Sequence, residues 1–457
     1  MKSSYTKLIL AILILGTFFG ACSQPSNEEK GPKLSIVQHA DWTKNANIYE
    51  VNIRQSTPEG TFNAFKKDLP RLKEMGVKIL WLMPIHPIGE ENRKGTEGSY
   101  YAVKDFKAVN PEFGTEEDFR ALVNEAHEMG FKVIIDWVAN HTAWDNIWTV
   151  NKDWYNLTED GNFQPPVEDW SDVIDLNYDN MDMRAAMKDA LEYWVREFDI
   201  DGYRCDVAGM VPTDFWIDVR KSLDEIKPVF MLAEDGEPEL LHEAFDMNYA
   251  WEYAHIIREI AAGEQTFADL DSLFERDAKR FPANAYRMYF TSNHDENSWN
   301  GTDPEMYGKN FENFAVLSAT VAGMPLIYNG QESDLDKRLE FFEKDEIEWK
   351  DYAYQDFYTI LLNLNTTNEA LWNGAHGGVM ERLESPEGTY AFLRKKGKAE
   401  VIVAINISDE PKAISVPAWS SDAYDKIGVI EGEFNNNDGQ TYDFELPANK
   451  WFILSSK

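Results

Sequence analysis

Cysteine is nearly absent from the chain, which has only Cys22 and Cys205 among its 457 residues. Cys22 ends an apolar N-terminal run, whereas Cys205 lies in an apolar segment typical of a core strand, so we exclude a disulfide between the two. Along that segment Cys205 alternates with Arg204 and Asp206 and points to the opposite face. We therefore expect Cys205 to be a buried, unreactive thiol.

Basic residues are scarce, because 44 Lys and Arg stand against 80 Asp and Glu, for a formal net charge of −36 at pH 7. Such a surface repels phosphate groups, which argues against a nucleic-acid partner and against anionic membranes bound through a basic surface. A neutral substrate is easier to reconcile with this charge. Aromatic residues make up 13% of the chain. They suit stacking on sugar rings but mostly fill the core in any protein, so the composition only permits a carbohydrate substrate.

A membrane-spanning run is missing at the N-terminus. The apolar stretch over residues 8–19 follows Lys2 and Lys7, as in an export signal. It is shorter than the ~20 residues of a spanning helix. Gly20-Ala21-Cys22 directly after it resembles a bacterial lipobox, which implies cleavage before Cys22 and lipidation of its sulfur.

These features predict an exported protein. We expect a lipoprotein signal peptide over residues 1–21 and a polar tether over residues 22–40. The mature chain is then held at the bacterial cell envelope, at the outer membrane, by a lipid anchor on Cys22. Whether it faces the periplasm or the cell surface stays open.

From residue 48 onward, short apolar runs typical of strands alternate with amphipathic stretches typical of helices. The predicted strands are residues 48–53, 77–82, 131–138, 202–207, 229–234, 244–247, 286–291 and 325–328. Apolar residues have helical spacing in residues 62–75, 116–129, 183–198, 213–226 and 311–321. Eight such units predict an α/β fold, a closed TIM (β/α)8 barrel, whose chemistry sits on the loops after the strands.

Two segments do not fit the repeat. Residues 141–180, after the third strand, hold several aromatics and no clear long helix, which predicts a short inserted subdomain or a functional loop. From residue 373 onward, strand-like runs surround a turn, as in an antiparallel β-sandwich. We therefore expect a barrel domain over residues 41–372, with the insert, and a C-terminal β-sandwich domain over residues 373–457.

Charged side chains stand where predicted strands end. Arg204 and Asp206 share one face of a strand, and an Arg neighbour lowers a carboxyl pKa, which would keep Asp206 ionised as a nucleophile. Glu234 ends an apolar strand, and apolar surroundings raise a carboxyl pKa, as a general acid requires. Taken singly, the first pair is equally compatible with a structural ion pair, and Glu234 with a helix N-cap.

The other strand ends add to this pattern. The third strand ends in a segment that holds Asp136, Asn140 and His141, which capping and loop structure would also explain. The seventh ends in His294-Asp295. If the strand count holds, the carboxylates of Asp206, Glu234 and Asp295 meet at one barrel mouth. Independent structural accidents would rarely align in this way.

Together these segments resemble the alpha-amylase family of glycoside hydrolases. The resemblance rests on residues 136–141, 202–206, 234 and 292–295, in the family's order, with flanking stretches at 76–84 and 323–332. It extends from about residue 47 to the C-terminus. It implies a TIM barrel with an inserted domain after the third strand, a C-terminal β-domain, and a retaining mechanism on α-glucosidic bonds.

The resemblance also implies roles for single residues. Asp206 would be the nucleophile, Glu234 the general acid and base, and Asp295 a stabiliser of the transition state. Four further residues would bind the substrate or orient the site: Tyr101, His141, Arg204 and His294. Tyr101 would stack beneath the sugar, with Tyr100 as the neighbouring candidate. Asp136 would support the site.

The sequence departs from the family in two places. The inserted segment is short, so we expect the donor-side wall of the cleft to be open or differently shaped. Many family members have Lys-His shortly after the nucleophile, where this chain has Gly209-Met210. This departure puts in doubt both the specificity on the leaving-group side and one calcium ligand. Asn140 and Asp175 remain candidates for a structural Ca²⁺ site, and a loop scaffold without metal is an equal alternative. No cofactor is required for the chemistry.

The sequence therefore predicts an exported, lipid-anchored hydrolase that acts on α-glucans or maltooligosaccharides. A transglycosidase is the nearest alternative, because it uses the same residues and differs only in whether water or a sugar accepts the intermediate. A non-catalytic glycan-binding lipoprotein is the alternative of another class. It predicts loss of at least one of the three carboxylates, and all three are present.

Overall fold

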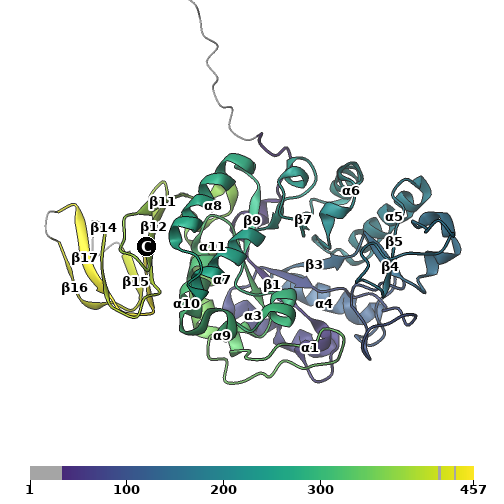
Figure 1. The fold of residues 1–457 in the computed structure, drawn as a ribbon, viewed down its shortest axis with the longest axis horizontal. Helices are drawn as coiled ribbons and strands as arrows, with labels where there is room; N and C mark the ends of the chain where they lie inside the picture. The colour runs from purple at the N-terminus through teal and green to yellow at the C-terminus, as the bar shows by residue number, and fades with distance from the viewer. Residues whose placement is uncertain (1–32, 420–423, 437–438, 457) are drawn as a thin grey trace, which may run out of the picture. The chain divides into compact units, whose positions relative to one another are not determined.

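The structure, a computed structural model, describes residues 33–419, 424–436 and 439–456 (Figure 1). The predicted signal peptide and Cys22 lie outside these residues, so both stay predictions. Within the described part of the chain, no helix is both long and apolar enough to cross a membrane.

The last residues of the predicted tether lie against the barrel. Ser35 N donates to Asn284 Oδ1 at 2.9 Å. His39 Nδ1 lies 2.7 Å from Asp246 Oδ1, and its ring stacks on Tyr286. The prediction of a tether up to residue 40 is therefore too long, because these polar side chains find partners on the barrel.

Eight parallel strands close into a barrel in the order β1, β10, β9, β8, β7, β6, β3, β2, which confirms the predicted architecture. Their bounds are β1 (Ile48–Val51), β2 (Ile79–Leu82), β3 (Lys132–Trp137), β6 (Gly202–Cys205), β7 (Phe230–Ala233), β8 (Met247–Tyr249), β9 (Tyr286–Tyr289) and β10 (Met324–Tyr328). The first and last strands of the barrel, β1 and β10, close the ring, with Ile48 opposite Leu326.

One predicted strand and one predicted helix are wrong in their bounds. The strand expected over residues 244–247 is β8, displaced toward the C-terminus, because the N–H groups of Ala244 and Phe245 bond locally to Leu240 O instead of joining the sheet. The helix expected over residues 62–75 is divided. Pro70, which has no N–H, starts a new helix and cannot continue an old one.

Helices and loops surround the barrel (Figure 1). Their bounds are α1 (Ile53–Ser56), α2 (Phe62–Phe65), α3 (Leu69–Met75), α4 (Glu116–Glu128), α5 (Met181–Phe198), α6 (Thr213–Ile226), α7 (Trp251–Ala262), α8 (Phe267–Arg280), α9 (Asp303–Tyr307), α10 (Phe311–Thr320) and α11 (Gln355–Thr367). Helix α4 illustrates why they form. Thr115 and Asp118 make a capping box at its start, and Phe119, Leu122 and Val123 bury one face.

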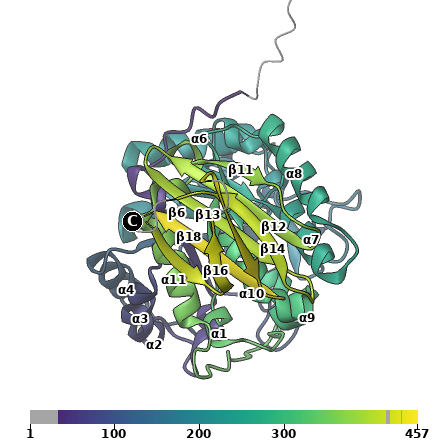
Figure 2. The same ribbon diagram turned by 90° about the vertical axis from the view of Figure 1, so that its left-hand side faces the viewer.

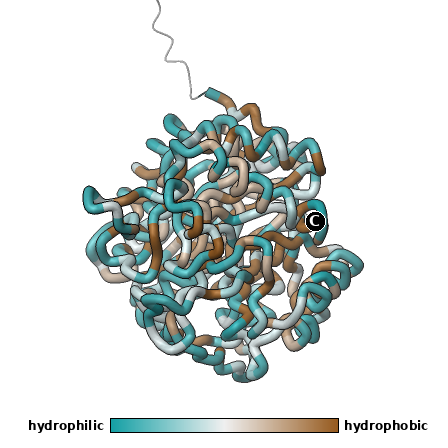
Figure 3. Tube along the Cα trace, turned by 90° about the vertical axis from the view of Figure 1, so that its right-hand side faces the viewer, coloured by the Kyte–Doolittle hydropathy of each residue, from teal (hydrophilic) through white to brown (hydrophobic). Residues whose placement is uncertain are grey.

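The hydrophobic core lies inside the barrel and beneath the helices. Large buried side chains such as Trp81, Tyr249 and Phe290 fill the barrel interior. Figure 3 shows hydrophobic stretches running through the middle of the molecule, with hydrophilic loops around them. A filled interior is a rigid support for the loops at the strand ends.

Residues 141–180, all of which the structure describes, contain no α-helix. They form a small antiparallel sheet of β4 (His141–Ala143) and β5 (Val173–Asp175), in which His141 stands opposite Asp175. Aromatic side chains pack around it, including Tyr155 against Phe163. The insert thus begins at a predicted site residue.

The C-terminal strands form two antiparallel sheets (Figure 2). Their bounds are β11 (Val379–Leu383), β12 (Thr389–Lys396), β13 (Ala399–Asn406), β14 (Lys412–Pro417), β15 (Tyr424–Gly428), β16 (Glu431–Asn435), β17 (Thr441–Leu446) and β18 (Lys450–Ser456). Ile402 and Phe444 pack in a core shared by both sheets, as predicted for a sandwich. Arg394 Nη1 donates to Val321 O at 2.8 Å and so joins β12 to the segment after α10.

Candidate active site

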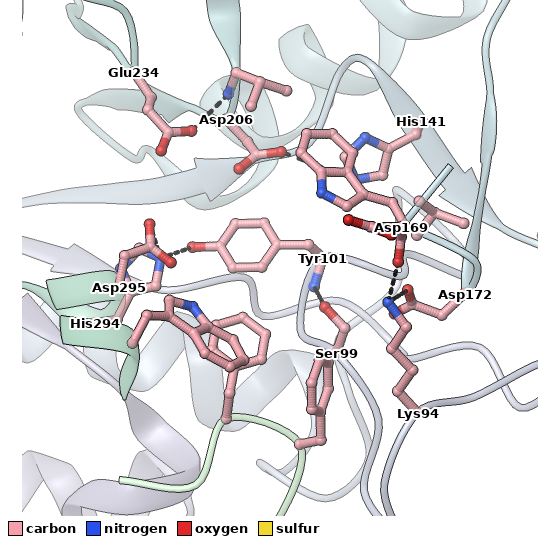
Figure 4. Close-up of a pocket in the computed structure, with 16 residues that line it drawn as sticks. Lys94, Ser99, Tyr101, His141, Asp169, Asp172, Asp206, Glu234, His294 and Asp295 are labelled. Carbon is pink, nitrogen blue, oxygen red and sulfur yellow. Dashed lines mark hydrogen bonds and ion pairs between the residues drawn. The ribbon is translucent and has the colours of Figure 1, made fainter. Parts of the chain in front are cut away.

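A cavity of about 560 Å³ lies where the barrel strands end (Figure 4). Six residues singled out from the sequence line it: Tyr101, His141, Asp206, Glu234, His294 and Asp295. The seventh, Arg204, is fully buried and contacts two of the lining carboxyl groups. The fold thus brings the predicted groups together from five separate segments.

Asp206 and Glu234 come directly after β6 and β7, which are neighbours in the barrel. The N–H of Val207 donates to Glu234 Oε2 at 2.7 Å. Val207 has a φ of +36°, a left-handed conformation that a β-branched residue rarely adopts. Strain of this kind is typical of functional sites, and here it points one backbone donor at the Glu234 carboxyl.

Arg204 lies beneath the cavity and contacts three carboxyl groups. Its Nη1 lies 3.1 Å from Asp206 Oδ1 and 2.9 Å from Asp136 Oδ1, and its Nη2 lies 3.0 Å from Glu234 Oε2. Its Nε donates to Tyr249 OH at 3.0 Å. One fully buried guanidinium therefore fixes three carboxyl groups, an arrangement suited to its planar geometry.

The pKa of Asp206 is raised well above its usual range. Burial is the main cause, and the Glu234 carboxylate raises this pKa further, while Arg204 lowers it. The prediction that Arg204 holds the Asp206 pKa down is therefore wrong in its net direction, because it left out burial and the second carboxyl group.

Asp136 has the supporting position expected of it. It is fully buried, and its Oδ2 accepts hydrogen bonds from Trp81 Nε1 at 3.2 Å and Tyr101 OH at 3.1 Å. Its carboxyl group connects Arg204 to the floor of the cavity without lining it. We infer that Asp136 orients its neighbours.

His294 lies between two carboxyl groups. Its Nε2 is 3.4 Å from Asp295 Oδ2, and its Nδ1 is 2.5 Å from Glu50 Oε1. Burial lowers the pKa of His294, but the carboxylates of Asp295 and Glu50 raise it to about 9 overall. His294 is therefore a cation at neutral pH and can donate from both ring nitrogens.

These two shifts predict a bell-shaped pH profile of kcat/KM. Activity falls as pH decreases through the raised pKa of Asp206, which must be ionised. It also falls as pH increases, because the general acid must keep its proton and because His294 loses its proton at about 9. The His294 ion pairs also stabilise the fold below its usual pKa of 6.5, and this stabilisation is lost as pH rises toward 9. A pH series with the parent and His294→Gln tests the assignment. A basic limb that is unchanged in the variant would contradict it.

Tyr101 and Tyr100 differ sharply in position. Tyr101 lines the cavity, and its OH lies 2.8 Å from His294 Nε2. Tyr100 is buried away from the cavity, with Arg54 over its ring and a hydrogen bond from Asn52. The position of Tyr101 is therefore the one compatible with a stacking platform.

His141 differs from His294 in its charge at neutral pH. Burial lowers its pKa to about 3, so it is neutral at neutral pH. Its Nε2 lies 3.9 Å from Asp206 Oδ2, beside the ring of Trp170. A neutral imidazole here can donate a hydrogen bond to a sugar without adding charge next to Asp206.

Asn140 and Asp175 line a second cavity of about 310 Å³, together with Met210. Their oxygen atoms are of the kind that Ca²⁺ prefers. However, Asp175 Oδ2 already accepts a hydrogen bond from Asn156 at 2.6 Å. Among the described residues no three His, Cys, Asp or Glu side chains gather as a metal site. A calcium site at Asn140 and Asp175 therefore stays a prediction, and no step below uses a metal.

Several lining residues were not singled out from the sequence as part of the site. They are Lys94, Asp169, Asp172, Trp299, Phe341 and Phe342, which lie on loops except for Trp299, in the short π-helical turn of residues 296–300. Glu50, the partner of His294, was also missed. A carboxylate inside the apolar run of β1 is a signal that could have found it, because a buried charge requires a partner.

Known families match most of the chain. The family model described as "Alpha amylase, catalytic domain" matches residues 40–354, and that described as "Alpha-amylase C-terminal domain" matches residues 378–454. Among curated proteins, Alpha-amylase MalA of Haloarcula japonica is 26% identical over 421 residues. That match covers 87% of this chain but 60% of the relative, so the chain spans less than two thirds of it.

Solved structures extend the likeness to both domains. An alpha-amylase from Lactobacillus plantarum is 30% identical with a TM-score of 0.80, over 91% of this chain and 100% of that one. A noncanonic maltogenic alpha-amylase, AmyB, from Thermotoga neapolitana is also 30% identical, with a TM-score of 0.78, over 91% and 99%. Since the catalytic-domain model covers most of the barrel that carries the clustered carboxylates, this chain belongs to the alpha-amylase family of glycoside hydrolases.

Proposed function

We propose that the enzyme is a retaining hydrolase of α-glucosidic bonds, mainly α-1,4, in starch-like glucans or maltooligosaccharides. One observation carries the mechanism: a single guanidinium, Arg204, contacts both Asp206 and Glu234. This contact holds both carboxyl groups at one cation and so keeps them close together, as a retaining enzyme with a spacing of about 5–5.5 Å requires.

In the first step, Asp206 attacks the anomeric carbon as the bond to the leaving oxygen breaks, and Glu234 donates its proton to that oxygen. In the second step, the ionised Glu234 takes a proton from water. The water oxygen then bonds to the anomeric carbon and releases Asp206. The two inversions together retain the α configuration, and Glu234 ends with the proton that it gave up.

The remaining groups stabilise the charges that develop. The Asp295 carboxylate lies across the cavity from Asp206 and offers negative charge to an oxocarbenium-like sugar (Figure 4). His294 as a cation and His141 as a neutral ring would donate to the hydroxyl groups of the same sugar. Tyr101 would stack beneath it.

The test is product analysis of the purified protein on starch, pullulan, cyclodextrin and maltooligosaccharides. We expect new reducing ends, with the first product of the α configuration by NMR before mutarotation. A β product would contradict the retaining mechanism.

The same experiment separates the alternatives. Longer or branched products without new reducing ends would show a transglycosidase instead. If the protein binds a glucan but changes none of them, it is the non-catalytic binding protein.

We also propose that the protein is exported and anchored at the outer membrane through a lipid on Cys22. The lipobox-like Gly20-Ala21-Cys22 after an apolar run motivates this proposal. Expression with a radiolabelled fatty acid is expected to label the parent and not Cys22→Ser. Equal labelling of both proteins would refute lipidation at Cys22.

A further inference from the structure

An ion pair crosses the end of the cavity that lies opposite Glu234 (Figure 4). Lys94 Nζ lies 3.1 Å from Asp172 Oδ1 and donates to the backbone carbonyl of Asp169 at 2.6 Å. Lys94 belongs to the loop between β2 and α4, whereas both aspartates belong to the insert. We call these three residues the Lys94 clasp.

The loop that carries Lys94 is also fixed on its other side. Glu97 N donates to Phe342 O at 3.1 Å, and Thr96 N donates to Glu343 Oε1 at 3.0 Å. Gly95 has a φ of +65°, and a Cβ added there would lie 2.5 Å from Phe342 Cβ. Only glycine permits so close an approach. Lys94 is thus held between the insert and the segment at Phe342.

Aromatic rings continue this wall back to the floor of the site. Lys94 Nζ lies 5.9 Å from the centre of the Phe342 ring. Phe342 packs against Phe341, with ring centres 5.0 Å apart, and Phe341 stacks on Tyr101 at 6.1 Å. Trp299 extends the wall at the rim and is 56% exposed. The wall therefore runs without interruption from Tyr101 to the Lys94 clasp.

The burial of the Lys94–Asp172 ion pair favours a stable contact. The Asp172 side chain is 7% exposed and that of Lys94 33%. Asp172 is thus largely removed from water, so loss of Lys94 would leave a nearly buried carboxylate without its partner, which is costly. The backbone carbonyl of Asp169 gives the same ammonium a second acceptor.

We propose that the Lys94 clasp closes the donor end of the cavity, so that the enzyme binds the non-reducing end of a glucan and releases short products. The inference rests on the proposed function, since Glu234 as the acid marks the leaving-group end. The sugars before the cleaved bond then extend from Tyr101 toward Lys94. The cavity has the size of a small-molecule site, and the three residues of the Lys94 clasp are among those that line it.

The experiment compares two maltoheptaosides with a UV-absorbing group at the reducing end, one with a free non-reducing end and one with that end blocked by an acetal. Chromatography of the labelled products measures cleavage at every bond. We expect the parent to prefer the free substrate by about tenfold or more in kcat/KM. Lys94→Ala is expected to reduce that preference about tenfold and to lengthen the products, while Lys94→Arg keeps the parent pattern. Asp172→Asn, which breaks the same pair from the insert, should act as Lys94→Ala does.

Lys104→Ala is the matched control. Lys104 Nζ lies 3.0 Å from Asp145 Oδ2 and so joins the same loop to the insert, with a similar side-chain exposure of 34%, but neither residue lines the cavity. It should keep the parent preference. Equal cleavage of both substrates by the parent, an unchanged preference in Lys94→Ala, or the same loss in Lys104→Ala would each overturn the inference. If the parent cleaves neither substrate, the proposed function itself fails.

Discussion

Replacement of Asp206 by alanine is expected to lower kcat on maltooligosaccharides by about 10⁴-fold or more. The variant has no group that can bond to the anomeric carbon, and Glu234 alone can only protonate the leaving oxygen. Asp206 is 8% exposed and makes its close ion pair with Arg204, so the shortened side chain leaves a small polar space beside the anomeric carbon. The measurement is steady-state release of reducing sugar.

Reaction of the variants with azide tests the assigned roles of Asp206 and Glu234 most directly. In Asp206→Ala, azide can occupy the vacated space, attack the substrate once and yield a β-glycosyl azide. In Glu234→Ala, azide instead attacks the covalent intermediate on Asp206 and yields the α anomer. The same anomer from both variants would contradict the assigned roles. Asp235→Ala is the control, because Asp235 follows Glu234 but does not line the cavity, and it should keep activity.

Replacement of Arg204 by methionine is expected to destabilise the protein by roughly 3–5 kcal/mol and to abolish most activity. Methionine keeps the unbranched apolar stem of the side chain but not its charged end, so the carboxyl groups of Asp136, Asp206 and Glu234 lose their shared cation. The acidic limb of kcat/KM should also move to higher pH, because the only group named above that lowers the Asp206 pKa is gone. Urea unfolding and a pH series measure the two effects.

Arg394→Met is the matched control for Arg204. Arg394 is equally buried but donates to backbone carbonyls, including those of Val321 and Trp372. Its loss should destabilise the fold without moving the acidic limb. An Arg204→Met protein with the stability and pH profile of the parent would refute the inference that the Arg204 guanidinium holds the three carboxyl groups and lowers the pKa of Asp206.

Much of the barrel could be predicted because most of its strands are short apolar runs, which can be recognised in the sequence without knowledge of the fold. Asp206 and Glu234 could be placed because each directly follows such a run, and Asp295 because it lies in the loop after β9. In a closed parallel barrel these strand ends meet at one rim. The bounds of β8 were predicted wrongly for a local reason. Phe245 is apolar but bonds within a turn, which hydrophobic pattern alone does not reveal.

The Lys94 side of the cavity could not be predicted because no periodic pattern governs it. Lys94 and Phe342 are far apart in the sequence and meet through backbone contacts at Gly95. The direction of the Asp206 pKa shift failed for a related reason. It depends on burial and on Glu234, which are set by the whole fold, rather than on Arg204 two residues away.

The closing pair of strands has a kinetic consequence. β1 pairs with β10, so Tyr49 meets Ile327 only after almost the entire barrel has left the ribosome. Until that moment each growing sheet has two open edges with unpaired N–H and C=O groups, and no partial barrel can seal them. Such long-range closure is slow and exposes open sheet edges to aggregation, so we expect closure of the barrel to be a late step in the folding of this enzyme.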